Sequence, residues 1–143
     1  MDQLDQLLSL YTRLIGVNGG GDRDLDHDLA AYLAARSGVA VLRDNDEFTG
    51  SIDLAVFFLE RALPGWQIHE LHCGPDPASS HIGDHRLAHL QSRRWYCDIC
   101  REHHADENAE GYGRTAPVAI LSAVITQLIS DVLTHWRLTQ RDA

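Results

Sequence analysis

Apolar side chains return every three or four positions over residues 4–15, which is the period of an amphipathic helix. Asn18 and the three glycines after it predict the end of this helix. We expect a second helix to start near Asp22 or Asp24 and to end at Ser37. Its apolar positions lie on one face: Leu25, Leu29, Tyr32 and Leu33.

The central part of the chain combines strand and helix patterns. Residues 39–42 form a short apolar run that predicts a buried strand. Ser51 is a good N-cap for a third helix, and Pro64 ends that helix. Residues 66–71 then alternate between apolar and polar side chains, which is the period of a half-buried strand. We expect residues 93–97 to form a strand that pairs with it.

The last helix is expected to begin after Thr115, with Pro117 tolerated in its first turn. It carries a wide apolar face: Val118, Leu121, Val124, Ile125, Leu128, Ile129, Val132, Leu133 and Trp136. Because the free energy of burial grows with apolar area, this pattern predicts the core helix of the protein.

A chain of 143 residues is long enough to fold as one domain with its own core. Hydrophobic residues make up 44% and charged residues 23%, which is the ordinary composition of a soluble globular protein. No charge-free apolar run reaches the roughly 18 residues of a membrane span. The N-terminus is acidic, whereas a secretory signal starts with basic residues. We therefore expect a cytoplasmic protein with no membrane partner.

The net charge is −9, from 21 acidic and 12 basic residues, and all the basic residues are arginine. A general nucleic-acid binder normally carries a basic face, so this balance argues against one. An acidic surface is compatible with a basic protein partner, or with a contribution to solubility alone.

The candidate chemistry lies in one segment, because all three cysteines and seven of the nine histidines fall within residues 69–104. Cys97 and Cys100 form a C-x2-C pair, which in a reducing compartment more often indicates metal binding or redox chemistry than a structural disulfide. His103 or His104 follows closely enough for one imidazole to reach the same zinc ion when a helical turn comes next.

The sequence does not decide which residue is the fourth zinc ligand. Cys73 is favoured because it is the remaining thiol, and pairing between the two predicted strands would bring it beside Cys97. His72 and His69 are the alternatives, although His72 and Cys73 would point to opposite faces of a strand. The sequence thus predicts a structural zinc ion held within this set: Cys73, Cys97, Cys100, His103 and His104.

Two further patterns have structural interpretations. Four aspartates alternate over residues 22–28 but lack the glycine and glutamate of a calcium loop, so we assign them to helix capping. His81, His85 and His89 are spaced four apart and on a helix could bind a second metal, but we prefer to interpret them as a solvated or partly buried histidine face.

Four short stretches carry a family resemblance: Arg23-Asp24-Leu25-Asp26, Phe48-Thr49-Gly50-Ser51-Ile52-Asp53, Leu63-Pro64-Gly65-Trp66 and Thr115-Ala116-Pro117-Val118-Ala119-Ile120. In this order they resemble small phage and prophage proteins of the phage ABA-sandwich domain type. The resemblance touches residues 22–73 and 114–135, and it implies an alpha-beta-alpha sandwich of phage or prophage origin. The chain departs from that pattern by an extra N-terminal helix and by the segment 74–113.

We therefore expect an α+β fold in a single domain, residues 1–143, with a small antiparallel sheet and helices packed as an alpha-beta-alpha sandwich. Residues 22–73 and 114–139 would form the sandwich core together with the long C-terminal helix. Residues 74–113 would form a Cys/His-rich insertion that zinc stabilises.

Three functional hypotheses follow. The first is a non-catalytic phage-type accessory protein that binds a protein partner, such as a host or defence factor, in the host cytoplasm. The second is a zinc-dependent hydrolase in which Glu102 or Glu70 acts as general base. The third is a structural virion or assembly component. No sequence motif supplies a catalytic residue, so the first is preferred.

Overall fold

The computed structural model describes residues 2–17, 21–37, 47–75 and 93–141. These residues form an α+β fold with a three-stranded antiparallel sheet and four helices, of which the C-terminal one is long. The elements are α1 (Gln3–Ile15), α2 (Arg23–Ser37), α3 (Ile52–Ala62), β1 (Trp66–Pro75), β2 (Arg93–Arg101), β3 (His104–Gly113) and α4 (Ala116–Arg141). The expected α+β class with its small antiparallel sheet is confirmed.

The helices begin and end where the sequence predicts. The hydroxyl of Ser51 accepts a hydrogen bond from the Leu54 backbone N–H at 3.3 Å and caps α3. One Asp22 carboxylate oxygen accepts the backbone N–H of Leu25 at 3.1 Å at the start of α2, which is the expected capping role. Gly65 follows α3 with φ +86°, a conformation that glycine adopts without strain. The strand expected at 39–42 falls outside the described residues.

The sheet is a meander in the order β1-β2-β3. The expected pairing of the strands around residues 66 and 93 is confirmed, with Trp66 opposite Arg101 and Cys73 opposite Trp95. Sequence patterning did not predict β3, which pairs with β2 from Trp95 opposite Gly113 to Arg101 opposite His104. Residues 93–113, assigned to an insertion by the sequence, therefore supply two of the three strands.

Two glycines of β3 let the strand approach the backbone of α4. A Cβ atom on Gly111 would lie 2.2 Å from the Ala123 nitrogen and 2.4 Å from the Ala119 oxygen. A Cβ atom on Gly113 would lie 2.6 Å from Cγ1 of Val118. Small residues at these positions are what allow the sheet to pack directly on the helix.

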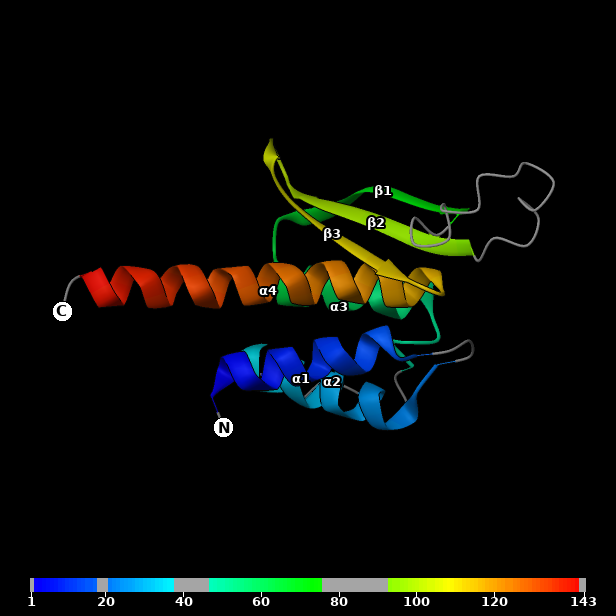
Figure 1. Ribbon diagram of the computed structural model, residues 1–143, viewed down its shortest axis with the longest axis horizontal. Helices are drawn as coiled ribbons and strands as arrows, with labels where there is room; N and C mark the ends of the chain where they lie inside the picture. Colours follow the sequence, from blue (N-terminus) through cyan, green and yellow to red (C-terminus); the bar gives the residue numbers. More distant parts are fainter. Residues whose placement is uncertain (1, 18–20, 38–46, 76–92, 142–143) are drawn as a thin grey trace.

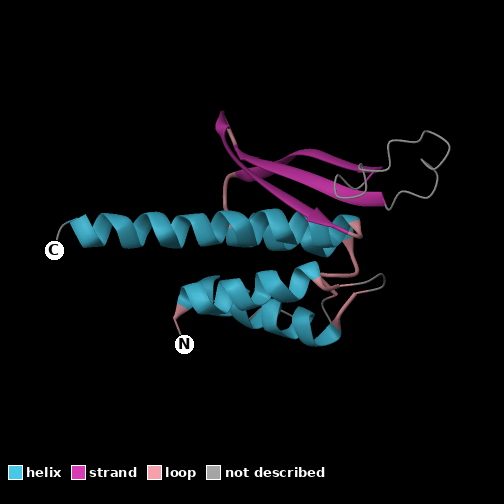
Figure 2. Cartoon of the chain, in the orientation of Figure 1, coloured by secondary structure: helices cyan, strands magenta, loops and turns pink. Residues whose placement is uncertain are grey.

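The described elements form three layers (Figures 1 and 2). The sheet is one outer layer, α3 and α4 lie beneath it, and α1 with α2 lies on the far side of α4. All four helices therefore lie on the same side of the sheet, so one sheet face contacts α4 and the other carries no helix of the described part. The last turns of α4 extend beyond the sheet and beyond α1.

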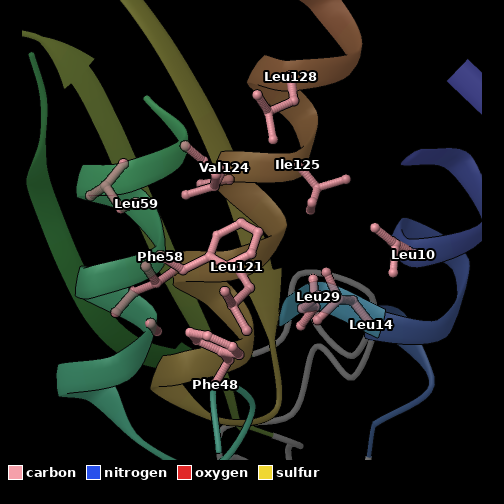
Figure 3. Close-up of a cluster of buried hydrophobic side chains, with 14 of the residues drawn as sticks. Leu10, Leu14, Leu29, Phe48, Phe58, Leu59, Leu121, Val124, Ile125 and Leu128 are labelled. Atoms are coloured by element: carbon pink, nitrogen blue, oxygen red, sulfur yellow. The ribbon is translucent and has the colours of Figure 1, made fainter. Parts of the chain in front are cut away.

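The core forms around α4, as the sequence predicts. Figure 3 shows side chains from α1, α2 and α3 converging on Leu121, Val124 and Ile125 of this helix. Phe48 and Phe58 are fully buried and meet edge to face, with ring centroids 5.5 Å apart.

Within the described residues, α4 is the one helix long and apolar enough to cross a membrane, over Ala116–Gln140. Of the most apolar window in that span, 61% is buried inside the protein. The core helix of a soluble protein passes the same test of length and composition, and α4 packs against α1, α3 and the sheet.

Candidate functional site

Side chains alternate between two faces of the sheet, and the pairing of the strands shows which residues share a face. On β2, Cys97 and Ile99 are fully buried against α4 and belong to the core. Their neighbours Tyr96 and Asp98 therefore point to the other face. The sheet has an apolar inner face and a polar outer face.

The C-x2-C pair lies within β2 rather than in a turn. Because Cys97 and Cys100 are three residues apart on one strand, their thiols point to opposite faces of the sheet. Cys97 is enclosed in the core, and burial, followed by the charge of Asp98, raises the pKa of its thiol to about 12. This environment disfavours the thiolate that zinc requires.

The other predicted ligands are spread along the sheet. Cys73 is half-buried on β1, diagonal to Cys97 and opposite Trp95. His103 lies in the β2–β3 turn with φ +66°, and His104 starts β3; both are exposed. The described residues contain no group of three His, Cys, Asp or Glu side chains placed to hold a metal ion. The described arrangement does not gather the predicted ligands around one ion, and the zinc site stays a prediction.

The two alternative ligands, His69 and His72, also lie at different places on β1. His69 lies at the bulge between Ile68 and Glu70, where the β1–β2 register shifts. The His72 ring packs against Tyr96 on the outer face, so His72 and Cys73 point to opposite faces as expected.

A row of three aromatic rings crosses the outer face at one register position. His72, Tyr96 and Tyr112 are directly opposite one another on the three strands. The His72 and Tyr96 ring centroids are 5.1 Å apart, and those of Tyr96 and Tyr112 are 5.3 Å apart. The guanidinium of Arg94 lies 4.9 Å from the Tyr112 centroid, within the range of a cation–π contact.

A row of three carboxylates lies two residues further along each strand. Glu70 is opposite Asp98, and Asp98 is opposite Glu110. Glu70 and Glu110 are exposed, whereas Asp98 in the middle is buried and accepts a hydrogen bond from Nδ2 of Asn108 at 3.3 Å. Nε2 of His72 lies 3.2 Å from the Glu70 carboxylate, which is an ion pair only when the imidazole is protonated.

The two rows form one feature, which we call the acidic-aromatic face: Glu70, His72, Arg94, Tyr96, Asp98, Glu110 and Tyr112. The Tyr96 hydroxyl connects the rows by donating a hydrogen bond to Oε1 of Glu110 at 3.1 Å. Burial, this hydrogen bond and the charges of all three carboxylates raise the pKa of Tyr96 well above its ordinary value. All three carboxylates therefore act on the Tyr96 hydroxyl.

Sequence reasoning missed this face because its residues come from three strands. Glu70, Asp98 and Glu110 are far apart along the chain and meet only through the strand register. One signal was present: Arg94, Tyr96 and Asp98 occupy every second position between apolar residues, the period of a two-faced strand.

Two of the stretches that carry the family resemblance meet in a buried polar network. Asp26 of α2 accepts hydrogen bonds from the backbone N–H and the hydroxyl of Thr49, each at 2.7 Å. Burial raises the pKa of Asp26, partly offset by these two hydrogen bonds. The network ties the start of α2 to the segment before α3, so these motif residues have a structural role.

Comparisons with models of known families, with curated proteins and with solved structures found no match to this chain. The functional argument therefore depends on the geometry of the site.

Proposed function

We propose that the protein is a non-catalytic accessory protein that binds a positively charged segment of a protein partner on the acidic-aromatic face. The carrying observation is the carboxylate row, in which Glu70, Asp98 and Glu110 are neighbours across three strands. Like charges directly opposite each other on a sheet are destabilising. Proteins retain unfavourable local arrangements of this kind, here the repulsion between neighbouring carboxylates, mainly at functional sites.

A cationic partner would relieve this repulsion. The face itself supplies one permanent positive charge, Arg94, whose guanidinium lies over the Tyr112 ring. The Glu70 side chain is 53% exposed and the His72 side chain 54%, so both rows are accessible from solvent. The net charge of −9 would also speed the approach of a basic protein and repel nucleic acid.

The phage or prophage origin and the alpha-beta-alpha sandwich are part of this proposal. They are supported by the order of the four short motifs and by the α+β class of the fold. In a sandwich, a second helical layer would cover the outer face of the sheet. We propose that a bound partner occupies this position.

The proposal is tested by titrating the protein with a short peptide that mixes arginine and lysine with serine. We expect binding that weakens as salt is added, because the contacts are charged and exposed. The variant Glu70→Gln/Glu110→Gln should bind about five- to tenfold more weakly, since it lacks two exposed carboxylates of the face. The control Asp5→Asn/Glu60→Gln has the same net charge but changes exposed positions on α1 and α3, and should bind like the native chain.

Equal losses in the two variants would mean that net charge alone attracts the peptide, and they would contradict the proposal. Binding of a DNA duplex in place of the peptide would do the same. The control Asp5→Asn/Glu60→Gln should keep the native thermal midpoint, because its side chains are exposed. Glu70→Gln/Glu110→Gln should keep or slightly raise the midpoint, because it removes the two like charges opposite Asp98.

A second candidate function, an assembly component, is favoured by one observation. Trp136 and Leu138 on the extending turns of α4 are 57% and 55% exposed. Large exposed apolar side chains are common at subunit contacts. If the protein assembles through this end of α4, light scattering will give an oligomer that Trp136→Ser converts to a monomer; a monomeric native chain would exclude this candidate.

A further inference from the structure

The aromatic row adds a specificity that charge alone does not give. We infer that the acidic-aromatic face recognises arginine side chains of its partner in preference to lysine. This inference rests on the proposed function, because it names the chemistry of the segment that the same face binds.

The chain itself shows that the aromatic row accepts a guanidinium. Arg94 of β2 places its Cζ 4.9 Å from the centroid of the Tyr112 ring on β3. Planar guanidinium groups stack on aromatic faces, and this contact is an internal example of that geometry. The neighbouring Tyr96 is partly exposed and occupies the centre of the row.

The aromatic and carboxylate rows are close enough for one arginine to use both. Positions two residues apart on a strand are separated by about 7 Å. The Tyr96 side chain leans across this gap, since its hydroxyl lies 3.1 Å from Oε1 of Glu110. A guanidinium stacked on the Tyr96 ring would thus have a carboxylate near its edge, where its N–H groups donate.

Lysine cannot make the same pair of contacts. Its ammonium group is a compact, strongly hydrated charge with no plane to stack, so it would use the carboxylates and leave the rings exposed. Charge attraction should be similar for the two residues, and the difference between them should come from the rings.

The test compares two peptides of equal length and charge, one built with arginine and one with lysine, on the native protein and on Tyr96→Phe and Tyr96→Leu. We expect the native chain to bind the arginine peptide about fivefold more tightly than the lysine peptide, the size of one cation–π contact at an exposed site. Tyr96→Phe keeps a ring and should keep the preference. Tyr96→Leu should reduce the ratio of the two affinities to near one.

The possible outcomes separate this inference from the proposed function. Equal affinities on the native chain, both weakened by Glu70→Gln/Glu110→Gln, would overturn the arginine preference and leave the binding of basic segments standing. No binding of either peptide would overturn both. If folded Tyr96→Leu still prefers the arginine peptide, the aromatic row is not the source of the preference. The comparison of the two peptides on the native protein tests the inference even if this variant does not fold.

Discussion

At the scale of single residues, the buried Asp26 carboxylate is the clearest case of a polar group that determines local structure. It receives two hydrogen bonds from Thr49 and lies near the charges of Asp22 and Glu47. Burial raises the pKa of Asp26 above its ordinary value, so the folded state favours the protonated form more than the unfolded state does. This residue should make stability depend on pH.

The direction of that dependence follows from linkage. Between the unfolded and folded pKa of Asp26, the folded state binds more protons, so the free energy of unfolding falls as pH rises through this range. Asp26→Asn keeps an oxygen that accepts from Thr49 and removes the charge. Denaturant titrations in mildly acidic and neutral buffer should show that this variant is less dependent on pH than the native protein, and at least as stable at neutral pH.

Asp26→Ala is the matched comparison. It leaves the buried Thr49 N–H without its acceptor, which should cost about 1–3 kcal/mol at neutral pH. If Asn and Ala destabilise the protein equally, the hydrogen bonds to Thr49 do not contribute as proposed.

At the scale of secondary-structure elements, the contact between β3 and α4 depends on the absence of side chains at two positions of β3. Gly111→Ala would place a methyl group 2.2 Å from the Ala123 nitrogen, so the strand has to move away from the helix. We expect a loss of about 1–3 kcal/mol, the usual cost of overpacking, measured as a lower midpoint in urea.

Gly74→Ala provides the control for this substitution. The added methyl group would lie 3.9 Å from Nδ1 of His72, an ordinary van der Waals distance. This variant should keep nearly the native midpoint. If Gly111→Ala were equally harmless, β3 could not lie as close to α4 as described.

The cysteine pair gives a second prediction at this scale. Because Cys97 and Cys100 point to opposite faces of β2, we expect protein purified without a metal-affinity tag to contain much less than one zinc per chain. Elemental analysis decides the question. One zinc per chain, lost in Cys97→Ser/Cys100→Ser, would instead establish the zinc site that the sequence predicts and require a different arrangement of β2.

The helices were predictable from the sequence because their apolar residues repeat with helix periods and their ends carry capping residues such as Ser51. β3 was not, because its buried positions are Ala109, Gly111 and Gly113, which give no hydrophobic signal. The cysteine spacing favoured a turn, although the alternation of Trp95, Cys97 and Ile99 between polar residues already indicated a strand.

At the scale of the whole molecule, the four described helices lie on one side of the sheet, and the acidic-aromatic face is on the other side. This face depends on contacts between residues from three strands, which no local pattern in the sequence encodes. The fold class was therefore predictable from the sequence, whereas the candidate site required the strand register. A charged surface on a rigid sheet is suited to a partner that arrives by electrostatic attraction.

The most direct test of this account is an NMR titration of the labelled protein with the arginine peptide. We predict that backbone amide shifts change most along β1, β2 and β3, around His72, Tyr96 and Glu110, and change little in α1 and α2. Shifts confined to the last turns of α4, or no shifts at saturating peptide, would contradict the assignment of the acidic-aromatic face as the binding site.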